Sequence, residues 1–136
     1  MLQFILQNQD HFPKVNDYVC LTHSDFKPVN LLYGKDGKVF VLDWEFAHLG
    51  IGILDFAILL RHRDQFPLEI ETLKQGYLQN GGTLSAEWLK SAMITDFVNI
   101  ATMMDTPAER PKLFKELKQS AETTIKHWNS LPSLFS

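Results

Sequence analysis

The spacing of apolar residues changes near residue 50, and this change limits the chain to a mixed fold. Residues 18–43 contain short apolar runs separated by turns, as in YVCLT, NLLY and KVFVLD. From residue 53 onward the apolar residues recur every three or four positions, which is the period of an α-helix. We therefore expect an α+β fold in which short strands and a hairpin are followed by about four helices.

A hairpin is predicted around the sequence GKDGK. Asp36 and Gly37 stand between two apolar runs, 31–33 and 39–42, and an Asp-Gly pair in that position is a strong hairpin signal. The earlier run YVCLT predicts one more strand, in which Cys20 is expected to be a packed thiol.

Helix-ending residues divide the second half of the chain, 53–129. Pro67 ends the first helix, and Gly81 closes the second in a position suited to a left-handed cap. A third helix is expected to begin at Ser85. The sequence TPAE, 106–109, has the pattern of a capping box that starts the last helix. The first residues, LQFIL, predict a short helix.

The bulk composition suits one domain over residues 1–136. The chain is 45% hydrophobic and 21% charged, which is typical of globular domains. A net charge of −3 gives no general attraction to nucleic acid or to an anionic membrane. No run is long enough to span a bilayer, and no basic leader is present, so no signal peptide is expected. A single cysteine favours a reducing, cytoplasmic location.

Three oxygen-bearing side chains are predicted to meet at one loop mouth. Asp25 and Asn30 lie in the loop between two expected strands, and Asp43 ends the strand that returns through the hairpin. Amide and carboxylate oxygens from Asn30 and Asp43 suit Mg²⁺, which takes further ligands from water and substrate phosphates. Asp25 is then left to accept a proton from a hydroxyl. This is the set of groups that phosphoryl transfer needs.

The segment HSDFKPVNLLYGKDGKVFVLDWE resembles the catalytic segment of the aminoglycoside phosphotransferase and choline kinase-like family, a branch of the protein-kinase-like fold. The family pattern is His-Gly-Asp, four residues, Asn, a hairpin, Asp-Trp-Glu and later an Asp-Leu-Ala helix. The resemblance covers residues 18–62 and rests on four pieces in the right order: His23-Ser24-Asp25, Asn30, Asp43-Trp44-Glu45 and Asp55-Phe56-Ala57.

The resemblance implies a role for each matching residue. Asp25 is the base that deprotonates the acceptor hydroxyl, and His23 braces the catalytic loop. Asn30 and Asp43 hold Mg²⁺ against the phosphates of ATP. A cation two residues after the base, Lys27, would meet the transferred phosphoryl group.

Two further acidic residues belong to the same pattern. Glu45 is expected to support the metal from its outer shell or to contact substrate, and both possibilities stay open. The resemblance gives Asp55 a structural role, in which it accepts hydrogen bonds from backbone amides of the loop. The motif DWEFAHLG replaces the DFG of protein kinases, which favours a small-molecule hydroxyl as acceptor.

The resemblance also implies that the chain is the C-terminal lobe of the kinase-like fold, with the catalytic loop and metal-binding hairpin in 18–47 and the helical part in 53–129. The glycine-rich strands and the lysine of an N-terminal nucleotide lobe are expected to be absent, since only 22 residues precede His23. The first hypothesis is therefore an ATP-dependent phosphotransferase lobe that is incomplete alone and needs the missing lobe.

Two alternatives remain open. One is a binding or dimerisation module derived from such a kinase, which would self-associate through uncovered apolar surface. The other is a metal-dependent hydrolase that uses four residues around a cation: His23, Asp25, Asp43 and Glu45.

The acceptor is not identified by the sequence. Several acidic residues in the helical half either attract a cationic amine or are ordinary surface charges: Asp64, Glu69, Glu71, Asp96 and Asp105. The run RHRD, 61–64, is interpreted as a solvated helix end, although its arginines could contact a neighbouring lobe.

Overall fold

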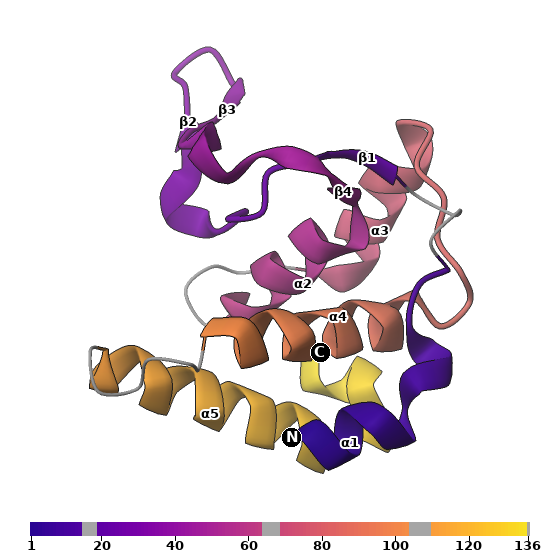
Figure 1. Ribbon diagram of the computed structural model, residues 1–136. Coiled ribbons are helices and arrows are strands. Elements are labelled where there is room, and N and C mark those ends of the chain that lie inside the picture. Colours follow the sequence, from indigo (N-terminus) through magenta and orange to yellow (C-terminus); the bar gives the residue numbers. More distant parts are fainter. Residues whose placement is uncertain (15–18, 64–68, 104–109, 136) are drawn as a thin grey trace.

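The computed structural model describes residues 1–14, 19–63, 69–103 and 110–135 and has an α+β architecture, as predicted (Figure 1). Its α-helices within these ranges are α1 (Leu2–Gln7), α2 (Ile53–Arg61), α3 (Ile70–Gln79), α4 (Trp88–Met103) and α5 (Pro111–Lys126). Its strands there are β1 (Val19–Thr22), β2 (Leu31–Tyr33), β3 (Val39–Val41) and β4 (His48–Ile51). Short 3-10 turns include 9–11, 28–30, 44–46 and the C-terminal η5 (Trp128–Phe135).

The strands form two separate antiparallel pairs. β2 and β3 pair with Leu31 opposite Val41, which confirms the predicted hairpin. Gly37 in its turn has φ of 80°, a left-handed conformation that explains the glycine there. β1 pairs with β4, with Val19 opposite Ile51. The sequence analysis did not predict β4, because HLGI is only four residues long and contains a glycine, which is unfavourable inside a strand.

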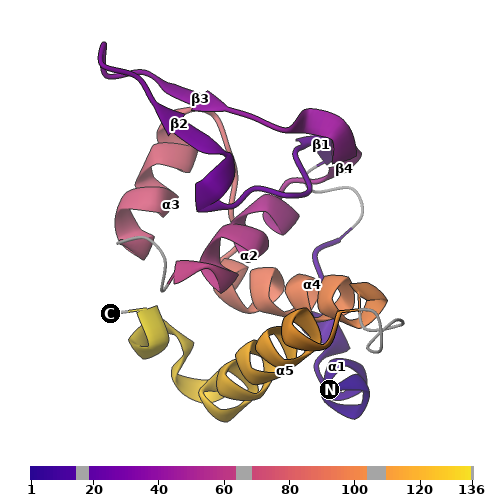
Figure 2. The ribbon, with the colours of Figure 1, turned by 90° about the vertical axis from the view of Figure 1, so that its left-hand side faces the viewer.

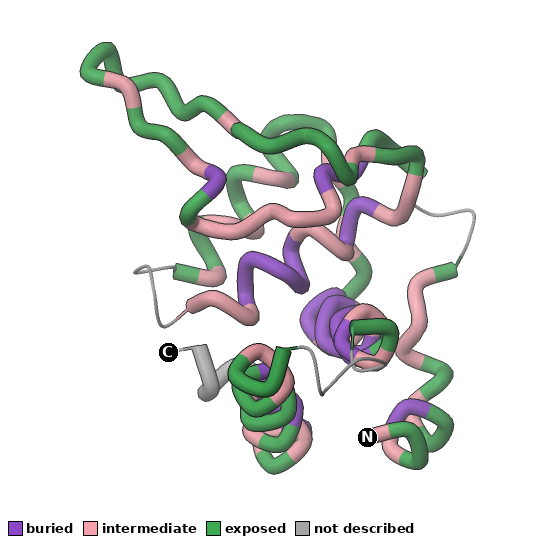
Figure 3. The backbone as a smooth tube through the Cα atoms, turned by 60° about the vertical axis from the view of Figure 1, so that its left-hand side comes forward, coloured by how far each residue is buried: buried purple, intermediate pink, exposed green. Residues whose placement is uncertain are grey.

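The core lies between α2 and α4, below the strands (Figures 1 and 2). Figure 3 shows that the buried positions concentrate on these two helices. Phe97 of α4 is 1% exposed and meets the ring of Phe4 edge-on, with centroids 5.6 Å apart. Phe4 also contacts Trp128 at 5.0 Å, so both ends of the described chain pack onto α4. This helical layer is the platform that supports the strands and their loops.

The helix boundaries agree with the predictions only in part. α2 ends at Arg61, so the prediction that Pro67 ends this helix is wrong. Gly81 has φ of 84°, and the backbone N–H of Gly82 donates to the carbonyl oxygen of Tyr77, so α3 ends in the expected left-handed cap. α4 begins at Trp88, three residues later than predicted. The predicted capping box at 106–109 lies outside the described residues. α5 starts at Pro111 with Arg110 as its N-cap.

The strands expose a broad apolar surface. Leu21 is 66% exposed and Leu49 opposite it is 74% exposed, while Tyr33 and Phe40 of the hairpin are 74% and 48% exposed. The prediction of a packed Cys20 is wrong, because this residue lies on the same strand and is exposed. Three consecutive residues of β1, Val19, Cys20 and Leu21, are exposed, so both faces of this end of the strand lack cover.

No helix in the described ranges is both long and apolar enough to cross a membrane.

Candidate functional site

A buried histidine holds the loop that joins β1 to β2. His23 is 2% exposed, and its Nε2–H donates to the carbonyl oxygen of Leu42 at 2.7 Å. Its Nδ1 accepts a hydrogen bond from the backbone N–H of Asp25 at 3.3 Å. Both ring nitrogens are therefore occupied by backbone groups. This geometry suits a residue that braces the loop and leaves no ring nitrogen for proton transfer.

Asp55 in the first turn of α2 ties the same loop to the helical layer. Its Oδ2 accepts from the backbone N–H of His23 and its Oδ1 from that of Ser24, both at 2.8 Å. Hydrogen bonds to an ionised carboxylate are among the stronger ones in proteins. The predicted structural role of Asp55 is confirmed by these two bonds.

Ser24 occupies the position where the family pattern has glycine. Its φ is 67°, in the left-handed region that glycine adopts without steric cost. Its hydroxyl lies 3.2 Å from the hydroxyl of Thr22 and 3.1 Å from Nδ1 of His48. The departure from glycine is therefore accommodated by strained backbone and compensated by side-chain hydrogen bonds.

Asp25, Asn30 and Lys27 are in direct contact at the loop mouth. Nδ2 of Asn30 donates to the backbone carbonyl of Asp25 at 2.9 Å and to its Oδ2 at 3.0 Å. Nζ of Lys27 lies 2.7 Å from the same Oδ2. Since the amide nitrogen of Asn30 is used in this way, its amide oxygen stays available as an acceptor. Asn30 itself is 7% exposed.

The hairpin returns Asp43 to the neighbourhood of this loop. The backbone N–H of Leu42 donates to the carbonyl oxygen of Asn30 at 2.8 Å. Asp43 is the next residue after Leu42, so this bond keeps it close to the loop. Asp43 has φ of 65°, the second left-handed non-glycine residue of the described chain. Within the described ranges its side chain and that of Glu45 make no hydrogen bond or ion pair. The shared metal position therefore stays a prediction.

No group of three or more His, Cys, Asp or Glu residues in the described ranges could hold a metal ion. The hydrolase alternative, which needs such a cluster, gains no support from this part of the chain. A magnesium site of one amide and one carboxylate does not need such a cluster, because Mg²⁺ keeps several waters.

Sequence reasoning missed a buried ion pair between α2 and α4. Nη2 of Arg61 lies 2.7 Å from Oδ1 of Asp96, and the two side chains are 8% and 5% exposed. The interpretation of Arg61 as part of a solvated helix end is therefore wrong. Burial, only partly offset by Arg61, raises the pKa of Asp96 to about 6. A signal was present, since Asp96 lies three residues after Met93 and four before Ile100, and so shares a helix face with two core residues.

A groove of about 1120 Å³ extends from the loop between β1 and β2 along α2, α4 and α5. Asp25 and Lys27 line one part of it, and Arg61, Arg63 and Arg110 line others.

The acidic residues considered for a cationic acceptor do not line this groove where they are described. Asp96 is buried against Arg61. Glu71 is exposed on α3, where it pairs with Lys74, and Glu69 precedes that helix. Asp64 and Asp105 lie outside the described residues.

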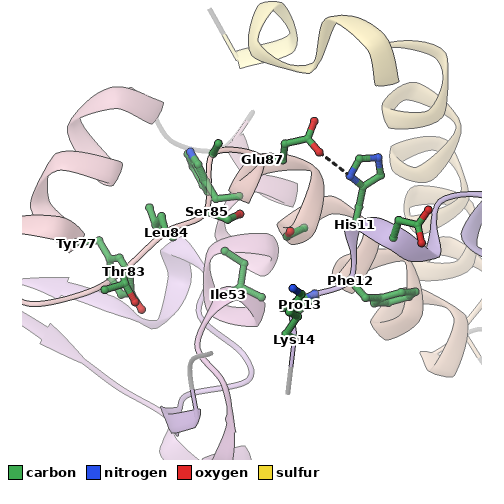
Figure 4. A pocket seen from close by; sticks show the side chains of 14 residues that line it. His11, Phe12, Pro13, Lys14, Ile53, Tyr77, Thr83, Leu84, Ser85 and Glu87 are labelled. Carbon is green, nitrogen blue, oxygen red and sulfur yellow. Dashed lines mark ion pairs between the residues drawn. The ribbon is translucent and has the colours of Figure 1, made fainter. Parts of the chain in front are cut away.

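A second cavity, of about 310 Å³, lies near the N-terminal segment (Figure 4). Figure 4 shows His11 and Glu87 at its edge, where they form an ion pair of 3.1 Å. Tyr77 and Trp88 are also among its lining residues. None of the predicted site residues lines this cavity.

The fold and the loop define an α+β domain with a loop that carries an aspartate, a hairpin, and a helix that anchors the loop through a carboxylate. The chain matches the model of the phosphotransferase enzyme family over residues 2–89 and belongs to that family. No curated protein and no solved structure matches the chain. Family membership supports phosphotransferase chemistry in general terms.

Proposed function

We propose that this chain is the C-terminal, catalytic lobe of an ATP-dependent phosphotransferase that acts on a hydroxyl group of a small molecule. The observation that carries the proposal is the loop mouth, where Asn30 and Lys27 hold the carboxylate of Asp25 at the edge of a large groove. A carboxylate in this setting can accept the proton of an incoming hydroxyl. Membership of the phosphotransferase family supports the same reaction class.

The remaining residues of the loop have supporting roles in this proposal. During transfer, Lys27 moves away from Asp25 and neutralises negative charge on the phosphoryl group. His23 and Asp55 keep the loop in place through bonds to its backbone. Their contribution is positional, because both ring nitrogens of His23 and both carboxylate oxygens of Asp55 are bonded to backbone groups.

The donor set at the hairpin suits magnesium and the phosphates of ATP. The free amide oxygen of Asn30 and the carboxylate of Asp43 are hard oxygen donors, and Glu45 follows two residues later. These residues would hold the ion, which when bound neutralises charge on the nucleotide phosphates. A nucleotide-binding lobe, in the same polypeptide or a separate one, would cover the exposed apolar strands.

The proposal is tested by phosphate transfer from labelled ATP and Mg²⁺ to a panel of hydroxyl compounds, with the full polypeptide that carries this segment. We expect Asp25→Asn to lower kcat by at least about a hundredfold, because the proton of the acceptor then has no base. Asp36→Asn is the matched control. Asp36 lies at the exposed hairpin turn beside Lys38, so its variant should keep the rate.

A rate that survives Asp25→Asn would show that Asp25 is not the base. A large loss in Asp36→Asn as well would show that the effect comes from the change of charge and not from the loop.

A second candidate is a module that binds another copy of the chain, and the exposed strand surface favours it. In that case the purified chain would form a stable dimer whose association does not change with ATP and Mg²⁺.

A further inference from the structure

We propose that the groove below Asp25 binds an acceptor that carries an anionic group, a carboxylate or a phosphate, at a distance from its reacting hydroxyl. This inference rests on the proposed function, because it names the acceptor class of the same site.

Positive side chains predominate among the described residues that line the groove. The cationic ones are Lys27, Arg61, Arg63 and Arg110, and the carboxylates are Asp25 and Glu116. Asp25 is already paired with Lys27 at 2.7 Å. Arg61 is paired in the same way with Asp96, also at 2.7 Å. The other charged lining residues are two arginines, Arg63 and Arg110, and one carboxylate, Glu116, so an anion meets more opposite charge here than an amine does.

Arg61 at the floor of the groove has hydrogen-bonding capacity left over. Its Nη2 contacts Asp96, and its Nη1 lies 3.9 Å from the sulfur of Met103, which is a weak acceptor. Its buried Nε has no hydrogen-bond partner, and neither has the buried Nδ2 of Asn99, which also lines the groove. Buried donors without acceptors are rare in folded proteins. Both nitrogens are buried, so their side chains would have to turn toward the groove to donate to the oxygen atoms of a bound anion, which planar guanidinium groups select.

A histidine, His62, also lines the groove. Burial lowers its pKa most; the positive charges of Arg61 and Lys27 lower it further, while the carboxylates of Asp25 and Glu116 raise it.

The test compares three hydroxyl compounds that differ in charge. Binding of sn-glycerol 3-phosphate, glycerol and choline to the chain is measured by NMR titration without nucleotide. We expect the phosphate ester to bind at least about tenfold more tightly than the other two, since charge-assisted hydrogen bonds to arginine are possible only for it.

Two charge-reversed variants near the start of α5 distinguish binding in the groove from a general effect of protein charge. Arg110→Glu should weaken binding of the phosphate ester by about tenfold, because Arg110 lines the groove. Lys115→Glu makes the same change of charge on an exposed residue of α5 that does not line it, and should change binding less than about twofold.

Equal binding of all three compounds, or equal effects of the two variants, would overturn the inference. Asp25-dependent transfer to choline with no preference for anions would support the proposed function and refute this inference. Groove binding of the phosphate ester without Asp25-dependent transfer to any acceptor would leave the anion site supported and contradict the proposed function.

Discussion

Ser24 holds a left-handed backbone at the point where the catalytic loop leaves β1. Its φ of 67° places its Cβ in a conformation that costs an L-residue roughly 1–2 kcal/mol. The backbone here is held in place, because Asp55 accepts hydrogen bonds from the N–H groups of His23 and of Ser24 itself. Strain at such a position persists only where surrounding bonds enforce it.

We predict that Ser24→Gly is more stable than Ser24→Ala by about 1 kcal/mol in free energy of unfolding. Both variants lose the hydroxyl that contacts Thr22 and His48, so their difference reports the backbone conformation alone. Glycine relieves the left-handed strain, and this outweighs its entropic cost in the unfolded chain. Urea unfolding of the two variants measures the difference. An alanine variant as stable as the glycine variant would show that the loop relaxes to negative φ.

At the scale of elements, one glycine inside α3 and one just after it have opposite backbone requirements. Gly81 caps the helix with φ of 84°, whereas Gly76 lies inside it, where an added Cβ would meet nothing within 4 Å. The same substitution should therefore have opposite effects at two positions only five residues apart.

We predict that Gly81→Ala destabilises the fold by about 1 kcal/mol and that Gly76→Ala stabilises it by up to about 1 kcal/mol. Alanine at Gly81 must adopt left-handed φ, while alanine at Gly76 adds helix propensity without a clash. Thermal unfolding followed by circular dichroism measures both. If both substitutions shifted Tm in the same direction, the cap of α3 would not depend on positive φ.

The ion pair between α2 and α4 makes stability depend on pH in an unusual direction. Burial raises the pKa of Asp96 from 3.8 to about 6, with Arg61 of α2 the charged group that opposes this rise. Between these values the folded chain retains a proton that the unfolded chain has lost. Because the folded state then binds more protons, the free energy of unfolding falls as pH increases through this window.

We predict that the stability of the natural chain relative to Asp96→Asn falls by up to about 3 kcal/mol between pH 4 and pH 7. Asparagine cannot ionise, so the difference isolates Asp96 from the other carboxylates. Urea unfolding at several pH values measures it, with Glu71→Gln on exposed α3 as control. A difference that stays constant with pH, or rises with it, would mean that attraction to Arg61 exceeds the cost of burial.

For the whole molecule, the two faces of the domain are unequal. On the helical side, aromatic side chains such as Phe4, Phe97 and Trp128 pack against one another. On the strand side, Leu21 and Leu49 are mostly exposed. Large apolar surfaces of this kind mark contact sites on soluble proteins.

We predict that the 136-residue chain associates through its strand surface, and that Leu21→Lys weakens this association by about tenfold or more, since a charge must then be desolvated. Leu78→Lys, at a 41% exposed position on α3, is the control and should leave association unchanged. Sedimentation velocity over a range of concentrations measures both. A chain that stays monomeric throughout, or equal effects of the two lysines, would contradict a role of this surface in association.

Much of the catalytic loop was predictable because its signals are local. The hairpin follows from the Asp36-Gly37 turn, and the spacing of Asp25, Asn30 and Asp43 places them on one loop and its returning strand. Even the bonds from Asp55 followed from the family pattern. The exposed state of Cys20 did not, because an apolar run does not indicate whether anything covers both faces of a strand.

The sequence by itself determined the elements and the order of the loop residues, since helix periodicity, turn residues and caps act over a few positions. Only the tertiary structure decided that β1 pairs with β4 and that Arg61 meets Asp96. These contacts join segments more than 25 residues apart, and many such pairings fit the same local pattern. The cationic groove is a product of those long-range contacts, because it exists only where α2, α4 and α5 come together beside the loop.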